Sequence, residues 1–294
     1  MTTAESMPLV SVVIPTLNSQ KLIENCLGSI KAQTYPNIEI IVVDGFSKDN
    51  TPDIARRYTE HVHIFGPDQS KERVFGGPYQ RNYGCAKARG QFVYWVDSDM
   101  ELPPTVIESC VRVSQETNCD AVNVFEESFG IGFWAQCKWL ERSCYVGEEL
   151  ISGPRFVRKT TWDKLGGLDA KLGAGDDWDL NERLREGGYK IASVSELVRH
   201  NEGDLRLWPL FRKRYVYGKT VRQYFKKHKD TKRNFAKFTL FRACFFKNWR
   251  LFVKHPILGL GVIFMRTGEY TSAALGIVKS IVAPQRVSLE TKPS

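Results

Sequence analysis

Two aspartates separated by one serine follow an unbroken run of strand-forming residues in QFVYWVDSDMEL, residues 91–102. If the backbone stays extended, Asp97 and Asp99 project to one side and lie about 7 Å apart along the strand. Paired carboxylates suit Mg²⁺ or Mn²⁺, ions that one or two carboxylates hold while substrate phosphates and water complete the coordination. The pattern therefore indicates a metal site that a nucleotide diphosphate would complete, or an ordinary turn, since Asp and Ser also favour turns.

Predicted strands and helices alternate ahead of these aspartates. LVSVVIP at 9–15 and IEIIVVD at 38–44 are buried strands, and a helical pattern follows each of them. This order is typical of a Rossmann-like α/β/α sandwich, in which helices cover a mostly parallel central sheet and ligands bind beyond the carboxyl ends of the strands. We expect Asp44, Asp97 and Asp99 to share that edge of the sheet.

The alternation continues after the two aspartates. Residues 103–117 predict a helix, residues 120–129 a strand, and the aromatic-rich residues 131–146 a further helix. An acid-capped helix then runs from about 177 to 186, and residues 189–194 predict a strand at the edge of the sheet. The acids at the start of that helix are a second candidate for chemistry.

The net charge of +9 is confined to one region of the chain. Residues 205–255 hold 16 Lys and Arg against one acid, Asp230, so the remainder of the chain is net negative. A segment this basic predicts an anionic partner: lipid headgroups, nucleic acid or acidic glycan. The uncharged runs at 255–265 and 270–278 that follow favour lipid, and no nucleic-acid partner is expected.

The two uncharged runs are too short to cross a bilayer. They contain 11 and 9 residues, whereas a spanning helix needs roughly 20. Arg266 and Glu269 separate them, so we expect an interfacial or re-entrant hairpin.

Several classes of protein are disfavoured by what the sequence lacks. No GxxxxGK[ST] loop and no GxGxxG after the first strand are present, which argues against a P-loop enzyme and a nicotinamide enzyme. Seven scattered cysteines without CxxC spacing predict neither a disulfide framework nor a zinc cluster and fit a reducing cytosolic setting. The first ten residues lack the features of a signal peptide.

Four blocks of the chain resemble the family 2 glycosyltransferases of the GT-A fold. They are VSVVIPTLN, IEIIVVDGFSKDNT, QRNYGCAKARGQFVYWVDSDMEL and GAGDDWDLNERLREGGYKI, in the family's order and spacing. The resemblance covers roughly residues 10–204. It implies a GT-A catalytic domain at 8–204, with a nucleotide-sugar-binding half at 8–100 and an acceptor half at 101–204, followed by a helical membrane-associating region at 205–294.

The resemblance also implies roles for the residues at the strand ends. Pro15 and Thr16 would line the nucleotide pocket, and Asp44 would accept a hydrogen bond from the base, most often uracil; its alternative role is a strand-end turn. Arg81 would approach the base or diphosphate, unless it lies on a solvated helix face. Asp97 would face the ribose or the metal, and Asp99 would bind the Mg²⁺ or Mn²⁺ directly.

On the acceptor side the resemblance implies a catalytic base at Asp177. The family places this base in an acidic pair that opens a helix, which corresponds to Asp176 and Asp177; the alternative is that both acids serve the helix N-terminus. Trp178 would stack on a sugar or belong to the core. His200 would be a further metal ligand or a structural histidine.

These implications together predict a metal-dependent inverting glycosyltransferase. The Gln-x-x-Arg-Trp motif of processive synthases is absent, which favours transfer of a single sugar. The donor would be a nucleotide-diphosphate sugar, with UDP favoured, and the acceptor a hydroxyl or phosphate on a lipid-linked molecule such as a polyprenyl phosphate, at the cytoplasmic face of the cell membrane. The alternatives are a sugar nucleotidyltransferase and a catalytically inactive sugar-nucleotide-binding membrane scaffold.

Overall fold

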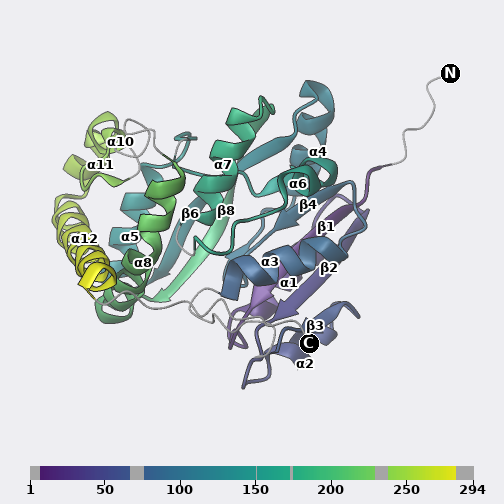
Figure 1. Cartoon of the computed structure of the whole chain (residues 1–294), viewed down its shortest axis with the longest axis horizontal. Coiled ribbons are helices and arrows are strands. Elements are labelled where there is room, and N and C mark those ends of the chain that lie inside the picture. Colours follow the sequence, from purple (N-terminus) through teal and green to yellow (C-terminus); the bar gives the residue numbers. More distant parts are fainter. Residues whose placement is uncertain (1–6, 67–75, 150, 173–174, 229–237, 283–294) are drawn as a thin grey trace.

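The computed structural model describes residues 7–66, 76–149, 151–172, 175–228 and 238–282 (Figure 1). Residues 229–237 and 283–294, parts of the predicted membrane-associating region, lie outside the described residues.

One eight-stranded sheet forms the centre of the protein, in the order β3-β2-β1-β4-β7-β6-β8-β5. β1 pairs in parallel with β2 and β4, β2 with β3, and β6 with β8, whereas β7 is antiparallel to β4 and β6, and β5 to β8. The strands are β1 Val10–Thr16, β2 Ile38–Asp44, β3 Val62–Ile64, β4 Phe92–Trp95, β5 Met100–Glu101, β6 Ala121–Ile131, β7 Phe156–Arg158 and β8 Ile191–Asp204. The sheet is mixed, so the mostly parallel sheet predicted from the sequence is confirmed only in part.

Helices cover both faces of the sheet and form the three-layer sandwich that the sequence predicts. Val12 and Ile14 of β1 pack towards α1 and α4, while Val13 between them packs towards α3, because successive strand residues point to opposite faces. Gly84 lets α3 lie directly on β1, since a Cβ there would come within 2.4 Å of Val13 Cγ1. The helices of these layers are α1 Ile23–Lys31, α2 Thr51–Arg56, α3 Gly76–Lys87, α4 Val106–Thr117, α6 Lys159–Leu165 and α7 Asp176–Glu186.

The last predicted strand is longer than expected and does not lie at the edge. β8 extends to Asp204 and lies between β6 and β5, where His200 pairs with Met100. The full length of this strand cannot be predicted from the sequence, because its second half is polar and lacks the alternation of apolar and polar residues that indicates a strand.

A group of helices packs at one end of the sandwich (Figure 1). These are α5 Phe133–Ser143, α8 Leu207–Lys227, α10 Ala243–Lys247, α11 Trp249–Lys254 and α12 Pro256–Val282. Cys137 and Leu140 of α5 form a small apolar core with Val262 and Met265 of α12. The predicted helix at 131–146 is therefore confirmed as α5, and it joins the sheet to the C-terminal helices.

The hairpin predicted for residues 255–278 is wrong, because α12 is one continuous helix. Arg266 and Glu269 lie on its inward face, each 3% exposed. Arg266 Nη1 is 2.5 Å from Glu141 Oε1 of α5, and Glu269 Oε1 is 2.8 Å from Arg214 Nε of α8. Since both charges are paired inside the helix group, they do not interrupt the helix. None of the described helices is long and apolar enough to cross a membrane.

Candidate active site

The ends of β1 and β2 form one wall of the candidate site. The Thr16 backbone carbonyl accepts hydrogen bonds from Gly45 N at 2.7 Å and from Gln80 Nε2 at 2.9 Å, which joins the two strand ends to α3. The Thr16 hydroxyl is buried and has no partner among the described residues. Pro15 is buried opposite Val43. Thr16 thus presents a free polar atom at the edge where a ligand is expected.

Asp44, the last residue of β2, is fully buried and holds the loop that follows it. The Ser47 backbone N–H donates to Asp44 Oδ2 at 2.8 Å, and the Ser47 hydroxyl donates to Oδ1 at 2.5 Å. The structure therefore shows the strand-end turn that was one of its two interpretations. A contact of Asp44 with a nucleotide base stays a prediction.

Arg81 of α3 connects the end of β4 to the start of α7. Its Nη2 lies 2.5 Å from Asp97 Oδ1 and its Nη1 lies 3.2 Å from Asp176 Oδ2. Arg155 binds the other oxygen of Asp97 at 3.0 Å. Burial alone would raise the pKa of Asp97, but the two guanidinium groups outweigh it and hold that pKa well below its ordinary value. The solvated helix face considered for Arg81 is wrong.

The two aspartates of the opening motif point to different partners. β4 ends at Trp95, and the backbone turns so that Met100 N donates to the Asp97 carbonyl at 3.0 Å. The expected extended geometry is therefore wrong. Asp97 faces the two arginines, while Asp99 Oδ2 lies 3.3 Å from His200 Nε2. Because both Asp97 oxygens are bound by arginines here, its role as a metal ligand stays a prediction.

Asp99 and His200 have the chemistry of a two-ligand metal site. Asp99 Oδ1 is buried without a partner, and His200 Nδ1 lies 3.1 Å from Glu126 Oε2, an arrangement that metal-ligating histidines commonly share. Burial would lower the pKa of His200, but its hydrogen bonds with Asp99 and Glu126 raise that pKa to about 9. No group of three His, Cys, Asp or Glu side chains in the described residues is placed to hold one ion. The pair fits an ion whose remaining ligands come from substrate and water.

The helix α7 begins with two acids in different surroundings. Asp176 is 7% exposed, and burial together with the charge of Asp177 raises its pKa to about 6 in spite of Arg81. Asp177 lines a cavity, and its Oδ1 accepts a hydrogen bond from Trp178 N at 2.8 Å. Gly153 lets its own loop lie directly against the start of α7, since a Cβ at this position would lie 2.7 Å from the Asp177 carbonyl oxygen. Asp177 is therefore the acid of the pair that a substrate can reach.

Trp178 combines the two roles considered for it. Its indole N–H donates to the Ile151 carbonyl at 2.7 Å, and its ring contacts Tyr224 and Phe238 edge-on. It also lines the cavity beside Asp177. The residue is fixed by aromatic packing and presents part of its ring to a ligand.

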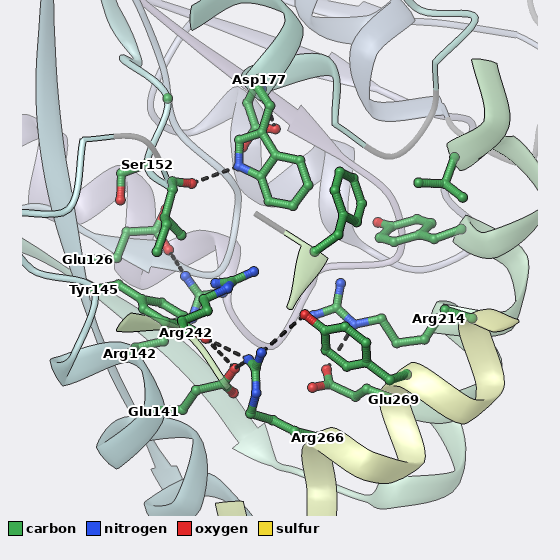
Figure 2. A pocket seen from close by; sticks show the side chains of 18 of the residues that line it. Glu126, Glu141, Arg142, Tyr145, Ser152, Asp177, Arg214, Arg242, Arg266 and Glu269 are labelled. Atoms are coloured by element: carbon green, nitrogen blue, oxygen red, sulfur yellow. Dashed lines mark hydrogen bonds and ion pairs between the residues drawn. The ribbon is translucent and has the colours of Figure 1, made fainter. Parts of the chain in front are cut away.

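The cavity has a volume of about 500 Å³ and lies between β6 and the helices α5, α7, α8 and α12. Figure 2 shows Asp177 at one end and Glu141, Arg266 and Glu269 at the other. Its charged lining consists of Glu126, Lys138, Glu141, Arg142, Arg155, Asp177, Arg214, Arg242, Arg266 and Glu269. Its apolar lining includes Val221, Phe225, Phe238, Ala273, Ala274 and Ile277.

Sequence reasoning missed three residues of the site. Arg155 joins Asp97 to Glu126 Oε1 at 2.7 Å, and Arg142 of α5 also pairs with Glu126. These residues link the Asp97 side of the site to His200. The available signal was a carboxylate inside the predicted strand DAVNVFEESF, because a charge in a buried strand needs a partner.

Comparison with known proteins finds a family model that matches the first half of the chain. Residues 11–154, just under half of the chain, match the family model described as Glycosyl transferase family 2. This segment is similar to the Glycosyl transferase family 2 domains. It contains the Thr16, Asp44, Arg81 and Asp99 positions, whereas Asp177 and His200 lie beyond it.

The curated proteins that this chain resembles include glycosyltransferases by name. The putative glycosyltransferase EpsH of Bacillus subtilis (strain 168) is 34% identical over 125 residues, which are 41% of this chain and 36% of that protein. Glycosyltransferase AglE of Haloferax volcanii is 27% identical over 207 residues, 66% of each protein. The chain thus spans from about a third to two thirds of the length of these two relatives.

Solved structures show that the chain has a GT-A-like α/β fold. The mannosyltransferase PcManGT from Pyrobaculum calidifontis, solved in complex with GDP-Man and Mn²⁺, superposes with a TM-score of 0.59 at 20% identity over 95% of this chain and 76% of that one. S. aureus TarS 1–349 in complex with UDP gives 0.53 at 16% identity, over 93% and 91%. At this identity the likeness concerns the fold.

Proposed function

We propose that the protein is an inverting glycosyltransferase that moves one sugar from a nucleotide-diphosphate sugar to an acceptor hydroxyl. The observation that carries the proposal is the double contact of Arg81 with Asp97 and Asp176. It holds the strand ends, where a nucleotide sugar binds in this fold, against the start of α7, where Asp177 opens onto the cavity. Donor and acceptor would therefore meet between Asp97 and Asp177.

In the proposed reaction the acceptor oxygen attacks the anomeric carbon of the donor sugar. A carbon–oxygen bond forms, the bond from that carbon to the diphosphate breaks, and the electron pair leaves with the nucleotide diphosphate. The Asp177 carboxylate takes the hydroxyl proton as general base. Asp176 cannot compete for this role, because it is buried against Arg81.

Asp99 and His200 would hold Mg²⁺ or Mn²⁺, which when bound neutralises charge on the leaving diphosphate. Arg81 and Arg155 are already held at the same edge by Asp97, so they can donate to phosphate oxygens with little reorganisation. UDP is the favoured nucleotide, with Asp44 as the acceptor of a base N–H.

We further propose that the protein works at the cytoplasmic face of a membrane on a lipid-linked acceptor. Large apolar side chains recur at three- or four-residue intervals on the outer face of α12, where Ile257, Leu260 and Phe264 are 71%, 69% and 60% exposed. Phe246 of α10 and Trp249 of α11 are also exposed. Lysines and arginines on the same helices would add attraction to anionic lipids of about 1 kcal/mol each.

A panel of nucleotide sugars tests the activity. Release of nucleotide diphosphate is measured with Mn²⁺ or Mg²⁺ and lipid-linked acceptors, with Asp99→Ala as the inactive control. We expect acceptor-dependent release for at least one UDP-sugar. Formation of a nucleotide sugar from a sugar phosphate, or donor binding without turnover for every acceptor, would instead support the nucleotidyltransferase or the inactive scaffold.

Flotation with anionic liposomes tests the membrane placement. The variant Leu260→Glu places a charge in the exposed row of α12 and is expected to lose flotation, while Gln115→Glu, an exposed position of α4 outside the C-terminal helices, is its control. Equal flotation of both variants and the unmodified protein would contradict this placement.

A further inference from the structure

The cavity beside Asp177 divides into three chemically different parts. Asp177 stands at one end, and the next residue, Trp178, also lines the cavity. At the other end Lys138, Arg214 and Arg266 face the carboxylates of Glu141 and Glu269. Apolar side chains of α8 and α12 form the wall between the cavity and the outside. A ligand that fills this space must therefore combine a hydroxyl, an anion and an apolar chain.

Cations outnumber carboxylates at the end away from Asp177. Glu141 is shared by Lys138 and Arg266, and Glu269 is shared by Lys138 and Arg214. Burial alone would raise the pKa of Glu141, but Lys138 and Arg266 hold it well below its ordinary value, so both acids count as charged. Three cations against two carboxylates leave a positive charge in a site of low dielectric, where it favours an anionic group.

Arg214 is the cation best placed to meet a ligand. It lines the cavity, and its guanidinium points into the centre of the space in Figure 2. Its side chain is 38% exposed although its Nε is bonded to Glu269 at 2.8 Å. No hydrogen bond from either Nη of Arg214 is found within the described parts of the chain, so both can donate to phosphate oxygens.

Two apolar lining residues of the cavity are also exposed. Phe225 of α8 is 40% exposed, and Ala274 of α12 is exposed, yet both line the cavity. Leu275 and Val278, on the outer face of α12 nearby, are 59% and 55% exposed. A chain that leaves the cavity here would run directly onto the exposed apolar face of α12.

We infer that this cavity is the acceptor site, and that it takes a sugar joined through phosphate to a single-chain lipid. The sugar hydroxyl lies at Asp177, the phosphate at Arg214 and the chain between Phe225 and Ala274. This inference rests on the proposed glycosyl transfer for the role of Asp177. A volume of about 500 Å³ accommodates one chain with a headgroup.

Binding of farnesyl phosphate to the full-length protein, measured by isothermal titration, tests this site. Ala274→Trp fills the mouth and is expected to weaken binding at least tenfold, while its neighbour Leu275→Trp, which does not line the cavity, stays within twofold. Arg214→Gln is expected to weaken binding at least tenfold, while Arg222→Gln, exposed on the same helix, stays within twofold. Farnesol and inorganic phosphate are expected to bind at least tenfold more weakly than farnesyl phosphate.

Several outcomes would overturn the inference. They are no binding of farnesyl phosphate, equal binding by Ala274→Trp and the unmodified protein, equal binding of farnesol or inorganic phosphate, and equal binding of a short-chain diacyl phosphatidic acid. UDP binding, measured on the same variants, is expected to stay unchanged. Failure of the proposed function would look different: no nucleotide sugar would be turned over, while farnesyl phosphate would still bind in an Arg214-dependent way.

Discussion

Two networks of buried charge lie about the candidate site, and they are built differently. The strand-end network consists of Arg81, Asp97, Glu126, Arg155 and His200, and the helix network of Lys138, Glu141, Arg214, Arg266 and Glu269. Both exclude most solvent. They differ in how completely their polar atoms are satisfied.

Three of the buried side-chain atoms without partners among the described residues lie at the strand ends, and the Asn123 amide inside β6 is also unpaired. Thr16 Oγ1, Arg81 Nε and Asp99 Oδ1 have none among the described residues, and no buried side-chain atom of the helix network is in this position. An unsatisfied buried polar atom costs about 1 to 3 kcal/mol, so such atoms are kept where a ligand completes them. Buried polar atoms are thus left for a ligand at the strand ends, whereas the helix network pairs its buried atoms, holds three helices together and leaves the exposed end of Arg214 for an anion.

Loss of Arg266 is expected to have the largest effect, because it breaks the satisfied network. Arg266→Met leaves Glu141, 2% exposed, with Lys138 as its remaining cation. We expect the free energy of unfolding to fall by about 3 to 5 kcal/mol, measured by urea denaturation. A loss below about 1 kcal/mol would show that the helix network does not stabilise the helix group.

A substitution in the strand-end network is expected to weaken ligand binding. Glu126→Gln weakens the hold on His200 Nδ1, and we expect Mn²⁺ affinity, measured by electron paramagnetic resonance, to fall about 10- to 100-fold. Glu127→Gln, the next residue of β6, serves as the control. An unchanged affinity in Glu126→Gln would separate His200 from the metal.

Asp176 is expected to make the free energy of unfolding depend on pH. Its folded pKa of about 6 is above the ordinary value of 3.8, so the folded state binds the proton more tightly and its contribution to stability is lost as pH rises from about 4 to 6. The Asp176→Asn variant should lack this component, which is on the order of 3 kcal/mol. Urea denaturation at several pH values measures it, and parallel curves for the variant and the unmodified protein would contradict the assignment.

The exposed ion pair between Arg206 and Asp204 is expected to contribute least to stability. Arg206 and Asp204 are 77% and 63% exposed at 3.1 Å. Arg206→Met is expected to change the free energy of unfolding by less than about 1 kcal/mol in the same denaturation experiment. A larger loss would mean that burial is not what separates Arg266 from a surface arginine.

The sequence predicted the parts of the fold that repeat a simple pattern. The buried strands β1 and β2 and the helix α5 follow from runs and periodicity of apolar residues. The polar half of β8 and the inward face of α12 could not be predicted, because the charged partners of His200, Arg266 and Glu269 are 55 or more residues away in the chain. In the sequence alone, a charge inside an apolar run indicates a break in the helix, and only tertiary pairing shows that the charge lies inside.

The candidate site was predictable where residues follow strand ends. Asp44, Asp97 and Asp99 lie at the expected edge because parallel strands bring their carboxyl ends together. The directions of Asp97 and Asp99 were not predictable, since the turn after Val96 turns the two carboxylates towards different partners. Glu126 comes from β6 and Arg155 from the segment before β7, and no local sequence pattern connects either residue to that edge.

The role of Asp177 is the central claim, and the Asp177→Asn variant tests it most directly. The substitution keeps the shape of the side chain and its hydrogen bond from Trp178 N, but removes the base. For the nucleotide sugar that the panel identifies, we expect turnover to fall about 100- to 10,000-fold while affinity for that donor stays within twofold. Turnover equal to that of the unmodified protein would contradict the account.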